Sequence, residues 1–340
     1  MPIDIAVDFG TSKTILLQGS KVVLEQPSVA TVDTETWEPV CFGERAYKMI
    51  GRTPESLTTV FPMTRGTISD YKTAELMLKY YMKEAFGHRV FKPRIMVSVP
   101  IAVTTLQHRS VANVARDAGG RSVCTIEAPV AAALGLGIDF TKPNGALIID
   151  IGAGTTDIAA VSMGGLAKSA SLGVASMDFD AAIIRFVKRK YNIMIGDLTA
   201  ESIKKQIGCV VKRQIPLTMN VGGMDMVSGL PVNFEITSDD VFEATKEVAN
   251  SICTGIKKVI SETDPDLLAD IMEKNAYLCG GGCQIYGMRE LVSEFTGMKI
   301  KQCEDPAHIV VKGARTALKN PELLKDGDYR FRSIEDLITD

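Results

Sequence analysis

The sequence predicts an α/β fold built from two copies of one domain, with a ligand cleft between the copies. Three observations support this: two apolar runs each end at an Asp-x-Gly turn, the two turns lie far apart in the chain, and the chain has 340 residues. That length allows about two domains, each with its own core. The apolar share of 46% and net charge of -3 fit a packed protein and give no sign of a nucleic-acid partner.

The later turn follows the apolar run from Ala146 to Ile149, which is typical of a buried strand. The run stops at Asp150, and Gly152-Ala153-Gly154 then leaves little side-chain bulk between the backbone and a ligand. Successive N–H groups in such a turn can surround an anion such as phosphate. An acid at the strand end can hold Mg²⁺ through water, because Mg²⁺ keeps much of its hydration shell. If the chain had only one such turn, the better explanation would be a tight β-turn that requires small residues for steric reasons alone.

The earlier turn repeats the plan. An apolar run leads to Asp8-Phe9-Gly10 and then to the hydroxyl-rich stretch Thr11-Ser12-Lys13-Thr14. Each copy continues into a second apolar run, a glycine turn and a third extended run, which indicates a duplicated domain. Asp8 is therefore the counterpart of Asp150 as an acid that orients hydrated Mg²⁺. Lys13 is either a phosphate donor or a solvated lysine, and its place in a phosphate turn favours the donor.

The pair DFGTSKT and DIGAGTTD resembles the two phosphate loops of the superfamily of actin, Hsp70 and sugar kinases. Further segments narrow the resemblance to the MreB family of bacterial actins. They lie in order along nearly the whole chain: EQPSVATV at 25–32, MIGRTPESL at 49–57, VSVPIAVT at 97–104, the stretch 179–208, and LCGGGCQI at 278–285. The resemblance implies an actin-like ATPase fold, with duplicated ribonuclease H-like domains around a nucleotide cleft. It also implies ATP or ADP with Mg²⁺ as ligands.

The domain boundaries follow from the same resemblance. Residues 1–139 correspond to domain I, whose small outer subdomain covers about 32–70 and to which the chain returns at about 312–340. Residues 140–311 correspond to domain II, with an outer subdomain at about 178–238. Trp37, the only tryptophan, falls in the first outer subdomain. Relatives use this subdomain in filament contacts, although Trp37 could equally be a local core residue.

The residues expected to bind nucleotide fall into three groups. The phosphate turns contribute Thr11, Ser12, Lys13, Gly152, Ala153 and Gly154. By resemblance, Glu201-Ser202-Ile203-Lys204 lies beside the ribose and adenine, whereas the residues alone would suggest an exposed helix face. Gly280-Gly281-Gly282-Cys283 follows a strand and opens the helix predicted for 285–295. Its three glycines permit close backbone approach to the adenosine and α-phosphate.

One departure from the family concerns hydrolysis. The residue before Pro129 is normally a glutamate that orients or activates the attacking water, and here it is Ala128. Glu127 is a possible substitute, but one residue along a helix turns a side chain by about 100°, so we expect it to point elsewhere. Thr155 is the remaining family residue near that water. We therefore expect ATP binding with slow or absent hydrolysis.

The periodicity from Tyr71 to Phe86 predicts an amphipathic helix that stops at Gly87. Val90 and Phe91 follow in a basic loop. In MreB proteins a hydrophobic loop at this place touches the membrane, and basic flanks suit an anionic surface. Packing of both residues on the preceding helix is an equally weighted alternative.

The resemblance implies a filament of identical copies at the inner face of the cell membrane, with the cell-wall elongation machinery as partner. The expected location is cytoplasmic, since no signal peptide is visible before the first strand and no apolar run approaches the roughly 20 residues of a membrane span. Of seven cysteines and three histidines, only Cys279 and Cys283 are close together, so no zinc site is expected. An Hsp70-like chaperone would need a peptide-binding domain after the ATPase, and a sugar kinase a substrate-binding acid. Neither feature is identified.

Overall fold

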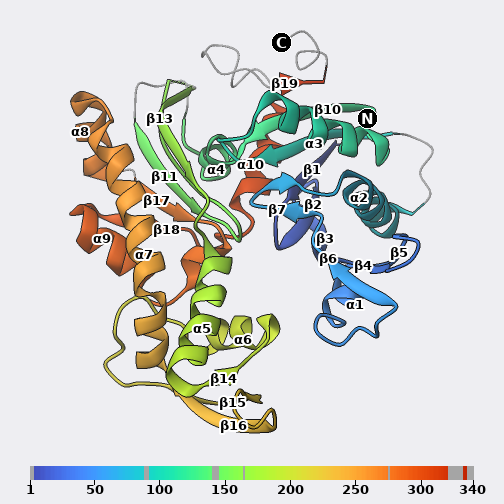
Figure 1. The fold of residues 1–340 in the computed structure, drawn as a ribbon. Helices are drawn as coiled ribbons and strands as arrows, with labels where there is room; N and C mark the ends of the chain where they lie inside the picture. The colour runs from blue at the N-terminus through green and yellow to red at the C-terminus, as the bar shows by residue number, and fades with distance from the viewer. Residues whose placement is uncertain are drawn as a thin grey trace.

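The computed structural model describes residues 4–87, 92–139, 145–163, 165–274, 276–320 and 332–334. Figure 1 shows two halves side by side, each with a large sheet and a smaller part below it. The half that contains the N-terminal strands is called domain I, and the other half domain II. Among the described residues, no helix is both long and apolar enough to cross a membrane.

The sheet of domain I has the order β19-β10-β9-β1-β2-β3. β1, β2 and β3 form an antiparallel meander, whereas β9 and β10 continue the sheet parallel to β1. The short edge strand β19 returns antiparallel to β10. The strands are β1 (Asp4–Phe9), β2 (Lys13–Gln18), β3 (Lys21–Pro27), β9 (Arg94–Val99), β10 (Ser122–Glu127) and β19 (Arg332–Ser333).

The sheet of domain II has the order β13-β12-β11-β17-β18. It also begins with an antiparallel meander, and β17 and β18 follow parallel to β11. The strands are β11 (Ala146–Ile151), β12 (Thr156–Ser162), β13 (Gly165–Leu172), β17 (Ala276–Cys279) and β18 (Ile300–Gln302). Five strands of each sheet therefore share one order and one set of directions, which confirms the predicted duplication.

Two helices, α4 (Ala128–Gly135) and α10 (Ile309–Lys319), pack together in a core that also takes side chains from both sheets. Their backbones approach very closely, because a Cβ added at Gly313 would lie 1.6 Å from the carbonyl oxygen of Ala131. The other face of the domain I sheet packs against α2 (Tyr71–Phe86) and α3 (Thr105–Asp117). In domain II the corresponding helices are α7 (Ser238–Ser261), α8 (Pro265–Lys274) and α9 (Met288–Thr296).

Each domain carries a smaller outer part. In domain I it contains β4 (Ala30–Asp33), β5 (Pro39–Phe42), α1 (Glu44–Tyr47) and β6 (Leu57–Val60), followed by the hairpin of β7 (Met63–Thr64) and β8 (Thr67–Ile68). In domain II it contains α5 (Ser176–Tyr191), β14 (Ile193–Met194), α6 (Asp197–Ile207), β15 (Thr218–Asp225) and β16 (Pro231–Thr237). In Figure 1, β4, β5, β6 and α1 lie below the sheet of domain I, and the outer part of domain II lies below its own sheet.

Three local predictions can be compared with these elements. The amphipathic helix at 71–86 and its end at Gly87 are confirmed. Trp37 is 60% exposed, so its interpretation as a local core residue was wrong. The glycine triplet opens a 3₁₀ helix at Gly281–Gln284 instead of the predicted α-helix. α9 starts only at Met288, because Gly287 has a left-handed backbone with φ of 86° that interrupts the helical path.

Candidate functional site

The same hydrogen bond closes the two Asp-x-Gly turns. Gly10 N–H donates to the carbonyl oxygen of Lys13 at 3.0 Å, and Gly152 N–H donates to that of Thr155 at 2.9 Å. Each turn joins the first two strands of its sheet, so the acid before it lies at a strand end. The duplication thus extends to the hydrogen bonding of the turns, and Lys13 occupies the position that corresponds to Thr155.

The two turns meet. A Cβ added at Gly154 would lie 2.6 Å from Thr11 Oγ1 and 2.9 Å from Arg65 Cα. Thr11 Oγ1 also accepts a hydrogen bond from Gly66 N–H at 2.7 Å. The β7–β8 hairpin, which carries Arg65 and Gly66, therefore packs against the phosphate turns of both domains. Gly154 has no room for a side chain.

The glycine triplet joins this arrangement from β17. A Cβ added at Gly280 would lie 2.4 Å from Asp150 Oδ1, and one at Gly282 would lie 2.6 Å from the side chain of Ile151. Gly281 has no atom within 4 Å of its added Cβ, so this position faces open space. The side chain of Cys283 is buried in the core of domain II, and burial raises its thiol pKa to about 12. Cys283 can therefore meet a ligand only through its backbone.

Three aspartates gather where the sheets meet, with Asp150 and Asp157 buried and Asp8 half-buried. Asp8 accepts a hydrogen bond from Ser98 Oγ at 2.8 Å, and Asp157 accepts one from Ile101 N–H at 3.3 Å. Burial, followed by the negative charges of Asp157 and Asp8, raises the pKa of Asp150 to about 8. Burial likewise raises the pKa of Asp157 to about 6 and that of Asp8 above its ordinary value. In the described part of the chain, no group of three or more His, Cys, Asp or Glu is arranged to hold a metal ion.

Lys13 does not stand alone in the first turn. Its ammonium pairs with Glu25 Oε1 at 2.6 Å, and the other oxygen of Glu25 lies 3.1 Å from His308 Nε2. These contacts link the first phosphate turn to β3 and to the segment before α10. Lys13 is thus an ion-paired residue beside the site, and it must leave Glu25 to reach a phosphate.

Helix α6, which carries the predicted sugar and base residues, contacts α5 through Lys204. Lys204 Nζ pairs with Asp180 Oδ2 at 2.6 Å, and the two side chains are only 12% and 16% exposed. The other oxygen, Asp180 Oδ1, is buried without a hydrogen-bond partner in the described structure. Lys204 therefore does not lie on an exposed helix face. Ile203 is fully buried in the outer core and can offer only its backbone, while the Ser202 hydroxyl accepts from Gln206 Nε2 at 2.8 Å.

The sheet register separates Glu127 from the cleft. Paired residues on neighbouring strands point to one face of a sheet, and successive residues alternate. Glu127 pairs with Val99, which lies in the core beneath α2 and α3, whereas Ser98 pairs with Asp8 on the opposite face. Ala128 begins α4 within the core shared by the two sheets. Ala128, one residue after Glu127, thus lies on the side of the sheet that contains the aspartates.

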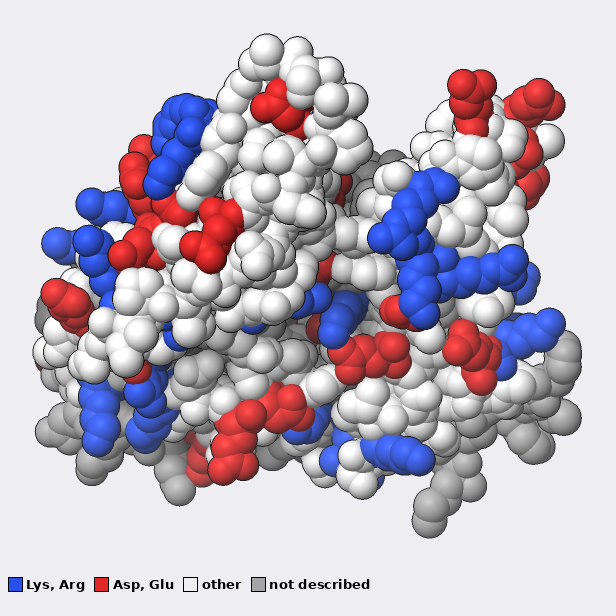
Figure 2. Space-filling view, turned by 90° about the horizontal axis from the view of Figure 1, so that it is seen from below, with Lys and Arg blue, Asp and Glu red and all other residues white. Residues whose placement is uncertain are grey.

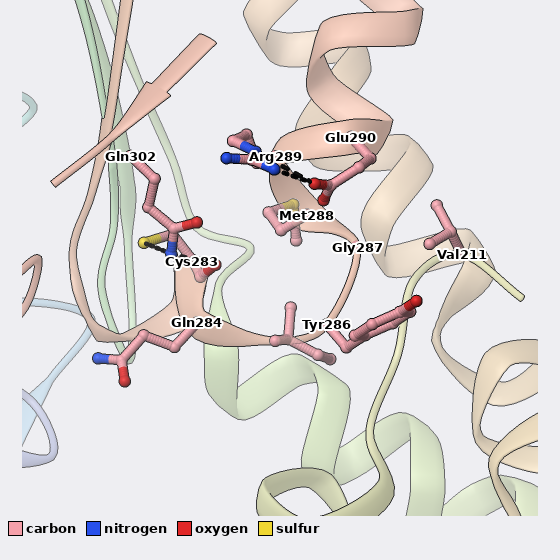
Figure 3. A pocket seen from close by; sticks show the side chains of 10 residues that line it. Val211, Cys283, Gln284, Tyr286, Gly287, Met288, Arg289, Glu290 and Gln302 are labelled. Atoms are coloured by element: carbon pink, nitrogen blue, oxygen red, sulfur yellow. Dashed lines mark hydrogen bonds and ion pairs between the residues drawn. The ribbon is translucent and has the colours of Figure 1, made fainter. Parts of the chain in front are cut away.

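A cavity of 310 Å³ lies beside the glycine segment (Figure 3). Figure 3 shows Gln302 beside Cys283, and its Nε2 lies 3.4 Å from the Cys283 carbonyl oxygen. The Tyr286 ring carries the Arg213 guanidinium at 3.9 Å from its centroid. The lining residues are Val211, Cys283, Gln284, Ile285, Tyr286, Gly287, Met288, Arg289, Glu290 and Gln302. The cavity shares Cys283 with the predicted nucleotide residues and includes none of those from α6.

Several residues at the site were not identified from the sequence. Asp157 lies near the start of β12, where it pairs with Asp150 of β11, and its burial is visible only once the sheets are assembled. Arg65 and Tyr47 come from the outer part of domain I, where the turn Thr64-Arg65-Gly66-Thr67 gives a hairpin signal but no link to the cleft. Val90 and Phe91 lie outside the described residues.

Comparisons with known proteins agree on one family. The family model described as MreB/Mbl protein matches residues 2–326. The chain is 36% identical to the cell shape-determining protein Mbl of Bacillus cereus over 94% of this chain and 97% of that protein. It is 33% identical to the cell shape-determining protein MreB of Escherichia coli over 93% of each chain.

Solved structures confirm the actin-like fold. MreB 5 of Spiroplasma citri bound to AMPPNP matches with a TM-score of 0.90 and 32% identity, over 95% of this chain and 97% of that one. The MamK double helical filament matches with a TM-score of 0.79, over 93% of this chain and 98% of that one. Its identity of 20% supports a likeness of fold alone.

The raised pKa of Asp150 predicts how stability depends on pH without nucleotide or metal. The folded protein holds this proton up to about pH 8, whereas the unfolded chain loses it near 3.8. Above about pH 6, where Asp157 has also lost its proton, the free energy of unfolding should therefore fall as pH rises to about 8, by up to about 1.4 kcal/mol per pH unit for the proton on Asp150. Asp150→Asn should remove most of this slope in urea denaturation with EDTA. Glu235→Gln, at an exposed acid of β16, is the control, and an equally steep fall in Asp150→Asn would contradict the assignment.

Proposed function

The chain belongs to the MreB/Mbl family, and from this premise we propose that it binds ATP with Mg²⁺ and polymerises into cytoskeletal filaments. The filaments would lie in the cytoplasm at the inner face of the cell membrane and guide cell-wall synthesis and cell shape. MreB 5 of Spiroplasma citri was crystallised with AMPPNP and with ADP, which supports a nucleotide in the corresponding cleft. The observation that carries the proposal is the convergence of both phosphate turns and the glycine triplet beside Asp8, Asp150 and Asp157.

The residues present fit this ligand. Burial raises the pKa of all three aspartates, and the charges of Asp157 and Asp8 raise that of Asp150 further, so a divalent cation bound near Asp150 and Asp8 would offset the cost of their charges. Asp8 and Asp150 would hold Mg²⁺ through water, in keeping with the preference of this ion for its hydration shell. The ion would supply charge stabilisation to the phosphates. Gly281 leaves the space that close approach of a nucleotide requires.

The other site residues have separable roles in this proposal. Thr11 and Ser12 present hydroxyl groups to phosphate oxygens, and Ala153 and Gly154 present backbone N–H groups. Gly152 N–H closes the turn on Thr155, so Gly152 contributes only the close approach of its backbone. Glu201 and Lys204 contact the ribose and adenine. Asp180 Oδ1, which has no partner in the described structure, supplies an acceptor for a hydroxyl beside Lys204.

The outer sheet of domain II supports self-association. Val227 and Leu230, in the hairpin between β15 and β16, are 86% and 64% exposed. Met226 beside them, Met194 on β14, which pairs with β15, and Ile215 before β15 are also exposed. Figure 2 looks at this end of the molecule, and the lobe of domain II at the top of the picture is mostly uncharged. Exposed apolar surface of this kind marks interaction sites. Used head to tail, one such surface can extend a filament.

High-speed pelleting tests polymerisation. Wild-type protein should sediment with Mg²⁺ and ATP and stay in the supernatant without nucleotide. The double variant Val227→Asp with Leu230→Asp should remain soluble under both conditions, because an interface would have to bury two unpaired charges. Leu106→Asp, at an exposed position of α3 outside both outer parts, is the control and should pellet. If wild-type protein does not pellet under any nucleotide condition, the filament proposal is refuted.

We propose that hydrolysis is slow, because Ala128 offers no base to the attacking water. Thr155 Oγ1 donates to Asp157 Oδ2 at 3.4 Å, which leaves its oxygen free to accept from water, but a neutral hydroxyl is a poor proton acceptor. A positioned base contributes about 10²–10⁴-fold. Phosphate release under polymerising conditions should therefore rise in Ala128→Glu and stay unchanged in Glu127→Ala. Loss of turnover in Glu127→Ala would make Glu127 the base.

Membrane contact through Val90 and Phe91 is proposed from the sequence and the family. Two buried side chains offer only about 1.5–3 kcal/mol each, so one loop should bind weakly and depend on the avidity of a filament. Flotation with anionic liposomes should require polymerising conditions and fall when both residues become serine. Phe61→Ser, at an exposed phenylalanine of domain I, is the control. Equal flotation of the loop variant would place the contact elsewhere.

A further inference from the structure

Two side-chain contacts run from domain I to domain II outside the phosphate turns. The Tyr47 hydroxyl, at the end of α1, donates a hydrogen bond to Glu201 in α6. Arg65 Nη2, in the β7–β8 hairpin, lies 3.8 Å from Asp178 Oδ1 in the first turn of α5. Figure 2 shows the surface hollowed between the two outer lobes that these contacts join. Tyr47 and Arg65 thus connect the outer part of domain I to the two helices that carry the proposed ribose and adenine residues.

The Arg65 contact is built into the phosphate site. Its Cα would lie 2.9 Å from a Cβ added at Gly154, and its Nη1 would lie 2.9 Å from one added at Gly173. The backbone of Arg65 therefore lies against the second phosphate turn, and its side chain extends along the segment that leads into α5. Asp178 Oδ2 accepts from Ala175 N–H at 2.8 Å, so the carboxylate is fixed at the helix start and its Oδ1 is directed to Arg65.

The Tyr47 contact uses one of the two oxygens of Glu201. Oε2 accepts from Tyr47, while Oε1 pairs with Lys205 at 2.7 Å within the same helix. Burial and the charge of Glu201 raise the pKa of Tyr47, so the phenol keeps its proton and is the donor. The carboxylate assigned to the nucleotide thus has one partner from its own helix and one from the opposite domain.

We propose that Tyr47 and Arg65 are positioning residues that hold domain I closed against α5 and α6 and thereby set the rate at which bound nucleotide leaves. The inference rests on the proposed nucleotide site. A nucleotide enclosed between the domains can leave only when they separate, and separation breaks both contacts. Removing them should therefore raise the dissociation rate, which is the rate that such contacts usually govern.

Release can be measured with radiolabelled ADP, which leaves the ligand chemically unmodified. Protein loaded with ADP and Mg²⁺ is mixed with excess unlabelled ADP and filtered at intervals. Tyr47→Phe should release ADP about tenfold faster. This corresponds to the lower end of the free energy that a hydrogen bond to a charged group contributes. Arg65→Ala should release it about two- to fivefold faster, because the arginine is 56% exposed and such ion pairs are weak.

Two controls separate closure from other effects. Lys205→Gln removes the other partner of Glu201 without breaking a contact between domains, and its rate should stay within about twofold of wild type. Asp178→Asn keeps an acceptor for Ala175 N–H but removes the charge that faces Arg65. If the two residues act through each other, Arg65→Ala with Asp178→Asn should be no faster than the faster single variant.

Each outcome decides a different point. Wild-type release rates in Tyr47→Phe and Arg65→Ala would overturn the inference, as would a Lys205→Gln variant as fast as Tyr47→Phe. The second result would mean that Glu201 itself, and not closure, controls release. Failure of wild-type protein to retain ADP at all would instead refute the proposed nucleotide site.

Discussion

The contact between α4 and α10 is the constraint on which the cleft depends. Both helices lie in the core shared by the two sheets, and a Cβ added at Gly135 would lie 2.2 Å from the carbonyl oxygen of Ile309. With Gly313 against Ala131, the backbones touch at two places where no side chain fits. Well-packed cores resist even one added methylene, so this spacing is fixed by contact between main chains. α4 begins at Ala128 beside the site and α10 begins just after His308, and the same packing therefore sets how the phosphate turns face each other.

The aspartates occupy the place where this rigid arrangement is least favourable to the protein alone. Burying carboxylates close to one another costs free energy, and the proton held by Asp150 is the response of the molecule to that cost. The site that we propose for a cation and phosphates is therefore a weak point of the fold in their absence. Retaining such strained groups is a common conflict between stability and function. The β7–β8 hairpin packs on the turns that follow Asp8 and Asp150, and Gly280 lies against Asp150 itself.

The sequence could predict the parts of the site that arise from local chemistry. An acid at a strand end followed by a small-residue turn occurs twice, and steric needs alone would not require the repeat. The prediction of two similar domains rested on this repeat. Lys13 shows the limit of such reasoning, since its partner Glu25 comes from β3 and engages it beside the turn. Tryptophan is usually well buried, so the residue type alone could not reveal that Trp37 is exposed. Tyr47 and Arg65 could not be predicted, because only the tertiary fold brings the outer part of domain I to α5 and α6.

Ala128 and the contacts between the domains bear on the same quantity, the lifetime of the bound nucleotide. In an actin-like protein with a positioned base, hydrolysis sets how long ATP persists. Here the strand register directs Glu127 away from the aspartates. Ala128, which lies on the side of the aspartates, has no functional group. If hydrolysis is slow, the dissociation of the nucleotide, and not its hydrolysis, would be the step that changes the nucleotide state of a subunit. The side chains that keep the domains together would in that case determine how long a subunit stays in the ATP form, and control would lie with Tyr47 and Arg65 in the outer part of domain I.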